Sequence, residues 1–117
     1  MRTPLVSVII PCWNAEDFVS AAIQSAFQQT YSLVEVIVID DGSTDGSLRQ
    51  IQTFDESITW VSGANQKGGA ARNKGLQLAK GELIQFLDAD DRLLRERLNK
   101  LVPEALAAGP GFMPICN

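Results

Sequence analysis

The sequence predicts an α/β protein with a doubly wound, mostly parallel, Rossmann-like sheet. Three short apolar runs rich in β-branched residues alternate with segments of helical spacing. Runs that are apolar throughout are typical of parallel strands buried beneath helices on both faces. Right-handed crossovers between such strands leave the ligand-binding crevice beyond the carboxyl ends of the strands.

The elements can be placed along the chain from their periodicity and from turn residues. The expected strands are Val6–Ile10, Val34–Ile39, Leu83–Leu87 and a weaker fourth, Ile58–Val61. Helices are expected to begin at Asn14, at Ser43 or Thr44, at Gly69 and near Leu93. Their expected inward positions are Phe18, Ala22 and Phe27, then Leu48 and Ile51, then Leu76 and Ala79, and finally Leu94, Leu98 and Leu101. Pro103 is expected to break or kink the last helix.

Composition bounds the fold to one domain, residues 1–117, and restricts its chemistry. A hydrophobic fraction of 45% with 21% charged residues is ordinary for a soluble folded chain, and a net charge of −4 argues against nucleic-acid partners. The absence of histidine excludes a Ser-His-Asp or Cys-His catalytic centre made from this chain. Leu5–Ile10 is too short to span a membrane. The two cysteines, Cys12 and Cys116, have no metal-ligand spacing, which fits a reducing compartment and a cytoplasmic location.

Carboxylates follow two of the expected strands at their carboxyl ends. They are Asp40 and Asp41 after the second strand and Asp88 and Asp90 after the Leu83–Leu87 strand. Like charges gathered at one sheet edge repel, and a hard divalent cation bridging to a diphosphate would relieve that repulsion. The start of the third helix, Lys67–Gly75, combines small residues and cations that suit an anion. It matches neither a Walker P-loop nor a dinucleotide fingerprint.

Four segments in order resemble glycosyltransferase family 2, whose fold is the nucleotide-diphospho-sugar transferase type called GT-A. They are Val6–Asn14, Val38–Asp45, Gly69–Gly75 and Phe86–Asp91, the last containing the Asp-x-Asp sequence. The resemblance covers about residues 5–106, from Leu5 to Leu106, and leaves residues 107–117 as a tail. It implies a nucleotide-sugar donor, uridine being the favoured nucleoside, and inverting transfer to an acceptor hydroxyl on a saccharide, lipid or protein.

The resemblance also implies roles for individual residues. Substrate-binding residues would be Pro11, Trp13, Asp40, Asp41, Arg72 and Asp88. Asp41 would recognise the base, in a pocket lined by Pro11 and Trp13, with Asp40 supporting the loop. Arg72 would contact the nucleotide and Asp88 the ribose or the metal. Asp90 would be the catalytic metal ligand, holding manganese or magnesium together with Asp88.

The chain departs from the family pattern after Asp91. Neither a Glu-Asp motif nor a Gln-x-x-Arg-Trp motif follows, and the remaining acids Glu96 and Glu104 are expected on a structural helix. The general base is therefore unassigned, and the chain is expected to be the N-terminal donor-binding portion of a longer enzyme, acting in the cytoplasm or at the cytoplasmic face of the membrane.

Two alternatives remain beside an active glycosyltransferase. One is a catalytically silent nucleotide-sugar-binding fragment. The other is a magnesium-binding receiver-like module, although a receiver carries its acidic pair after the first strand, where this chain has Pro-Cys-Trp-Asn. A strand order of 3-2-1-4 would also leave Leu83–Leu87 at a sheet edge, which favours a homodimer.

Overall fold

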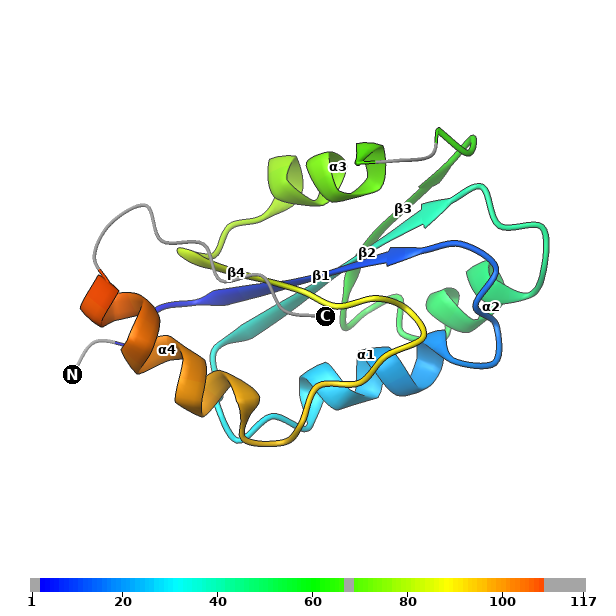
Figure 1. Ribbon diagram of the computed structural model, residues 1–117. Coiled ribbons are helices and arrows are strands. Elements are labelled where there is room, and N and C mark those ends of the chain that lie inside the picture. Colours follow the sequence, from blue (N-terminus) through cyan, green and yellow to red (C-terminus); the bar gives the residue numbers. More distant parts are fainter. Residues whose placement is uncertain (1–2, 67–68, 109–117) are drawn as a thin grey trace.

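A computed structural model describes residues 3–66 and 69–108, which form a parallel sheet with helices on both faces (Figure 1). The elements in chain order are β1 Val6–Cys12, α1 Val19–Phe27, β2 Val34–Asp41, α2 Ser47–Gln52, β3 Thr59–Gly63, α3 Ala70–Leu78, β4 Leu83–Phe86 and α4 Arg97–Ala108. The strand order is β3-β2-β1-β4 and every pairing is parallel. The predicted fold class and strand order are therefore confirmed.

The sheet separates two apolar clusters. On the face covered by α3, Ile9, Ile37 and Phe86 form a small buried cluster. The opposite face carries the larger cluster, in which Val8, Ile10 and their neighbours meet α1 and α4 (Figure 1). Successive strand residues alternate between the two clusters, as the two-residue period of a strand requires. All four β4 side chains are buried.

The helix α3 lies close to the sheet because Gly75 has no side chain. A Cβ at Gly75 would stand 2.4 Å from the Cγ2 atom of Ile9 in β1. This close approach brings the first turn of α3 next to the carboxyl ends of β1, β2 and β4, where the candidate site lies.

Several sequence-based helix starts were wrong. α1 begins at Val19 after Phe18, with no side-chain cap, so Asn14 does not cap it. α2 follows Gly46 rather than Ser43 or Thr44. Gly69 does precede α3, as predicted.

The inward faces were only partly predicted. Ala22, Ile51, Leu98 and Leu101 are buried. Three other expected core positions are exposed, since their relative accessibilities are 55% for Phe18, 44% for Phe27 and 81% for Leu94. The true inward face of α1 is Val19, Ala22, Ile23, Ser25 and Ala26.

The last helix also differs from its prediction. It begins at Arg97 rather than near Leu93, and it continues through Pro103 to Ala108, so Pro103 does not end it. The expected tail therefore starts no earlier than residue 109, and residues 109–117 lie outside the described part of the chain.

Candidate functional site

Two hollows open at the carboxyl ends of the strands. The first, here called the β2–α3 cavity, has a volume of about 490 Å³ and lies between β2, β3 and the start of α3. Its polar lining includes Asp40, Asp41, Ser62, Gln66, Asn73, Lys74 and Gln77. The second, here called the β1–β4 hollow, has a volume of about 340 Å³ and is lined by Pro11, Trp13, Asn14, Ala15, Phe18, Asp88, Ala89 and Asp90.

The two carboxylates of the β2–α3 cavity have different environments. Asp40 is buried, its Oδ2 accepts a hydrogen bond of 2.9 Å from the Ser62 hydroxyl, and its Oδ1 has no partner among the described residues. Asp41 is half-buried, and its Oδ1 accepts a 3.0 Å bond from the Gln66 backbone N–H. Asp41 is thus the more accessible of the two, while Asp40 is buried and bonded to Ser62 of β3.

The turn after β2 requires a glycine. Gly42 has a φ of 74°, a backbone angle that residues with a side chain rarely adopt, and a Cβ there would stand 2.5 Å from the backbone nitrogen of Asn65. Gly42 therefore lets the loop after β2 lie against the segment after β3, which brings Asp41 to Gln66.

The β1–β4 hollow joins exposed apolar side chains to two carboxylates. Trp13 is 56% exposed and Phe18 is 55% exposed, and both line the hollow together with Pro11. Asp88 and Asp90 line it from the loop after β4. An accessible aromatic surface beside paired carboxylates can hold a ligand with a flat ring and a cation.

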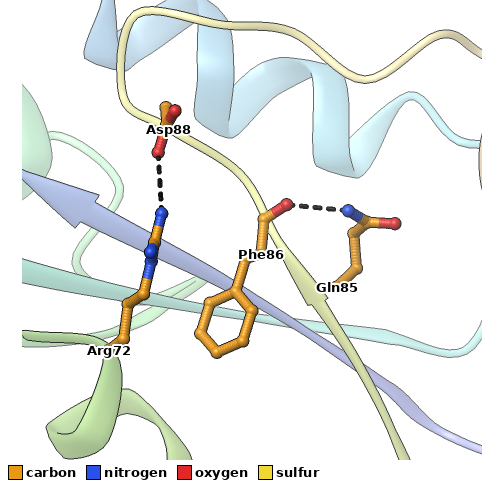
Figure 2. Close-up of polar contacts among 4 residues, drawn as sticks. All are labelled: Arg72, Gln85, Phe86 and Asp88. Carbon is orange, nitrogen blue, oxygen red and sulfur yellow. Dashed lines mark hydrogen bonds and ion pairs between the residues drawn. The ribbon is translucent and has the colours of Figure 1, made fainter. Parts of the chain in front are cut away.

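Arg72 links α3 to the acidic loop. Its Nη2 lies 3.6 Å from Oδ1 of Asp88, and its guanidinium stands 5.6 Å from the centre of the Phe86 ring (Figure 2). The Arg72 and Asp88 side chains are 45% and 43% exposed, so this ion pair contributes at most about 1 kcal/mol. The pair can therefore open at little cost when a ligand enters.

The loop after β1 is joined to the loop after β2 by hydrogen bonds. Asn14, which has a φ of 47°, donates its backbone N–H to the Ser43 hydroxyl at 3.0 Å and accepts from the Thr44 N–H through its side-chain oxygen at 2.8 Å. The Ser47 hydroxyl accepts from the Ala15 N–H at 2.8 Å. These contacts join the loop that carries Trp13 to the loop after β2.

Asp45 adds a further contact between these loops. Its carboxylate accepts from the backbone N–H groups of Ser47 at 2.9 Å and Glu16 at 3.2 Å. The hydrogen bond with the Ser47 hydroxyl, followed by the backbone bonds, lowers the pKa of Asp45 below its usual value.

Cys12, the last residue of β1, is not a nucleophile at neutral pH. Burial raises the pKa of its thiol to about 11, while a hydrogen bond with Ser47 lowers this pKa and the charges of Asp40 and Asp45 raise it further. The thiol is therefore protonated and serves as a small packing residue.

The structure brings some predicted site residues together and separates others. Pro11, Trp13, Asp88 and Asp90 share the β1–β4 hollow, whereas Asp40 and Asp41 line the β2–α3 cavity. Lys74, an exposed residue of α3, also lines that cavity. Lys67 lies outside the described residues.

Residues 3–66 and 69–108 contain no cluster of three or more side chains of the types that ligate metals. The acidic pair Asp88 and Asp90 would therefore share any cation with oxygens of a ligand or with water. Within the same ranges, no helix is long and apolar enough to cross a membrane.

Sequence reasoning missed two buried polar side chains that hold the acidic loop, Ser25 and Gln29. Both are below a tenth exposed, and both bond to the backbone of the segment after Asp91. Their spacing of four residues at the end of an apolar helix was the available signal, since polar residues on an inward face need partners.

Comparison with known proteins identifies the family. The family described as "Glycosyl transferase family 2" matches residues 7–113. The chain is 39% identical over 111 residues to the Escherichia coli "UDP-Glc:alpha-D-GlcNAc-diphosphoundecaprenol beta-1,3-glucosyltransferase WfgD", which covers 93% of this chain and 44% of that protein.

Solved structures agree with the sequence match. S. aureus TarS 1-349 in complex with UDP-GlcNAc aligns with a TM-score of 0.73 at 28% identity, covering 85% of this chain and 30% of that one. The mannosyltransferase PcManGT from Pyrobaculum calidifontis, in complex with GDP-Man and Mn²⁺, aligns with a TM-score of 0.71 at 28% identity, covering 77% and 28%. The chain spans less than half the length of the curated relatives it matches. With four parallel strands in the order β3-β2-β1-β4 and acidic loops at their carboxyl ends, the chain has a GT-A type fold and belongs to glycosyl transferase family 2.

Proposed function

We propose that this chain binds a nucleotide-diphospho-sugar, in the first instance a UDP-sugar, together with a divalent cation, as the donor-binding part of a glycosyltransferase. The observation that carries the proposal is the shared lining of the β1–β4 hollow, where Trp13 and Pro11 face the same space as Asp88 and Asp90. Family membership and the nucleotide complexes of the structural neighbours support it.

The donor's nucleoside would have to span both hollows, with Trp13 and Pro11 in the β1–β4 hollow and Asp41 in the β2–α3 cavity. Trp13 offers an exposed indole for stacking, Pro11 lies beside it, and Asp41 supplies an accessible carboxylate that accepts hydrogen bonds from a base. Asp40, which is enclosed and bonded to Ser62, would support the loop. Arg72 would contact the nucleotide after it leaves Asp88.

The cation would be Mn²⁺ or Mg²⁺. Both prefer oxygen ligands and both complete their coordination with phosphate oxygens and water, which fits a site with only two carboxylates. Asp90 and Asp88 would hold the ion, and Asp90 would be the catalytic ligand. When bound, the ion neutralises charge that develops on the leaving diphosphate.

A thermal or urea unfolding series tests donor binding. At a ligand concentration of roughly 100 times Kd, binding to the native state alone adds about 2.7 kcal/mol to the free energy of unfolding. UDP with Mn²⁺ should give that shift, and UDP with EDTA a smaller one. An unfolding curve with UDP and Mn²⁺ that coincides with the ligand-free curve would refute the proposal.

Two carboxylate variants separate metal binding from base recognition. Asp90→Ala should remove the effect of Mn²⁺ on UDP affinity, whereas Asp41→Asn should weaken UDP binding with or without Mn²⁺. The asparagine retains the acceptor for the Gln66 N–H, so it tests the charge rather than the loop. Glu104→Ala, an exposed change of the same charge on α4, is the control. If Asp41→Asn, like Asp90→Ala, lost only the part of UDP affinity that depends on Mn²⁺, the role of Asp41 in base recognition would be wrong.

Transfer to an acceptor hydroxyl would be inverting, with a saccharide, lipid or protein as acceptor. We assign no general base among the residues of this chain, so donor binding without appreciable transfer is the expected outcome for the 117-residue chain. A radiolabelled UDP-sugar assay that follows both hydrolysis and transfer distinguishes a silent binding domain from an active one. A cytoplasmic location is proposed from the sequence, whose two cysteines suggest no disulfide framework.

We also propose that the chain self-associates through β4, the last strand in the order β3-β2-β1-β4. Since the side chains of β4 are buried within one chain, a partner would pair with its backbone. A charged substitution such as Gln85→Lys, which would discourage pairing at an exposed edge, is unsuitable as a test because Gln85 is 0% exposed and an unpaired buried lysine would destabilise the chain itself. Light scattering over a concentration series decides, and a monomer at every concentration would contradict self-association.

A further inference from the structure

The acidic loop belongs to an irregular segment between β4 and α4. At its start, the Leu87 N–H donates to the carbonyl oxygen of Ile9 at 2.9 Å, and the Asp91 N–H closes a turn onto the carbonyl of Asp88 at 3.0 Å. From Asp91 to the first residue of α4, Arg97, no strand or helix holds the backbone. The position of Asp88 and Asp90 therefore depends on what anchors the far side of the segment.

That anchor is the end of α1 and the residues just after it. The Ser25 hydroxyl accepts from the Leu93 N–H at 3.0 Å and donates to the carbonyl of Ala22 at 2.7 Å. The Gln29 amide group donates through Nε2 to the carbonyl of Leu94 at 2.7 Å. In the view of Figure 1 the segment runs alongside α1 before it enters α4.

Gln29 also holds the first turn of α4. Its Oε1 accepts from the N–H of Leu98 at 3.0 Å, and Leu98 is the second residue of that helix, where the N–H has no partner within the helix. Its Nε2 donates additionally to the carbonyl of Ser25 at 3.2 Å. One buried amide thus joins α1, the irregular segment and α4.

Burial makes these contacts firm. Ser25 is 7% exposed and Gln29 is 8% exposed, so water does not replace a lost partner. The Thr30 N–H adds a parallel bond of 3.1 Å to the carbonyl of Arg95. Leu93, which Ser25 holds, is only three positions from Asp90, so displacement of Leu93 changes where the acidic loop lies.

We propose that Ser25 and Gln29 are positioning residues that hold Asp88 and Asp90 in place for the cation, and thereby set the metal-dependent part of nucleotide affinity. The inference rests on the proposed donor binding. It assigns a binding role to side chains on the opposite face of the sheet from α3, which do not line either hollow.

Calorimetry on the intact chain tests it with UDP in Mn²⁺ and UDP in EDTA. The ratio of the two dissociation constants measures the metal-dependent enhancement. In Ser25→Ala this enhancement should fall by about tenfold, the usual effect of losing a residue that orients metal ligands. The UDP dissociation constant in EDTA should change by less than about twofold, because the loops after β1 and β2 keep their own hydrogen bonds. Gln29→Met should have the same effect.

Ile51→Val is the matched control, because Ile51 is fully buried in α2 and its truncation lowers stability without touching the segment. It should leave both dissociation constants unchanged. Ser25→Ala removes a single hydroxyl and decides the outcome if Gln29→Met does not fold.

A second readout does not depend on ligand. The Asp91 N–H bonds within the acidic loop and not to Ser25, so its hydrogen exchange in the ligand-free chain should accelerate several-fold in Ser25→Ala if the loop is loosened. If Mn²⁺ enhances UDP affinity in the wild type and enhances it equally in Ser25→Ala, this inference is wrong and the proposed donor binding still stands. Absence of any UDP binding by the wild-type chain would overturn the proposed function, and this inference with it.

Discussion

Replacing Gly75 by alanine should destabilise the protein even though alanine favours helices. The change gains about 1 kcal/mol of helix propensity in the middle of α3. Against it, the new Cβ would stand 2.4 Å from Cγ2, 3.3 Å from Cδ1 and 3.4 Å from Cβ of Ile9. Ile9 is 0% exposed in the central strand pair, so its side chain has no room to turn away. Overpacking of this kind costs about 1–3 kcal/mol, so after the gain in helix propensity we expect a net loss of up to about 2 kcal/mol.

Urea denaturation of Gly75→Ala and Gly63→Ala measures the difference. Gly63 ends β3, and a Cβ there meets nothing within 4 Å, so the same substitution should be neutral or slightly stabilising. The loss in the double variant Gly75→Ala/Ile9→Ala should be smaller than the sum of the two single losses, because the clash is then absent. If Gly75→Ala is as stable as the wild type, close contact between α3 and β1 is not what places the first turn of α3, with Arg72, beside Asp88.

Three further changes have defined outcomes. The free energy of unfolding should fall by about 2–3 kcal/mol as pH rises from 9.0 to about 11, because the Cys12 thiol ionises at its ordinary value of 9.0 when unfolded but only at about 11 when folded. Cys12→Ala should lack this fall in urea titrations at those pH values. Gly42→Ala, which combines a φ of 74° with a 2.5 Å approach to the Asn65 nitrogen, should cost about 1–3 kcal/mol by the same assay. Ser62→Ala removes the hydrogen bond to the buried carboxylate of Asp40 and should cost about 1–2 kcal/mol, and an unchanged midpoint would show that this bond contributes nothing net.

The sheet could be predicted because each strand carries its own signal. Val6–Cys12 and Val34–Asp41 are apolar, β-branched runs that end in turn residues, and their pairing follows from crossover handedness. The helix starts could not be predicted as well, because their end groups are satisfied from far along the chain. Asn14 is of a residue type that often caps helices, yet its side-chain oxygen accepts the N–H of Thr44 instead. In α4, the N–H of Leu98 is satisfied by the side-chain oxygen of Gln29, which lies 69 positions earlier in the chain.

The presence of carboxylates at the carboxyl ends of the strands could likewise be predicted, but their separation into two hollows could not. Asp41 and Asp90 both follow strands, and sequence alone places both at one sheet edge. Their assignment to separate hollows depends on where α3 lies relative to β2 and where the segment after β4 turns. The exposure of Trp13 and Phe18 also follows from those turns, since the hydropathy of Phe18 by itself favours a core position.

The three carboxylates of the acidic loop differ in what already binds them, and this difference orders their availability to a cation. Oδ1 of Asp91 accepts the N–H of Arg92 at 2.8 Å, and Asp88 is paired with Arg72 at 3.6 Å. Asp90 is exposed and makes no hydrogen bond or ion pair with any residue in ranges 3–66 and 69–108. A cation can therefore reach Asp90 without breaking a contact, and reaches Asp88 by exchanging a weak, half-exposed ion pair. Because that exchange frees Arg72 for an anionic ligand, we expect the cation and a diphosphate each to raise the affinity of the site for the other, which UDP titrations with and without Mn²⁺ measure.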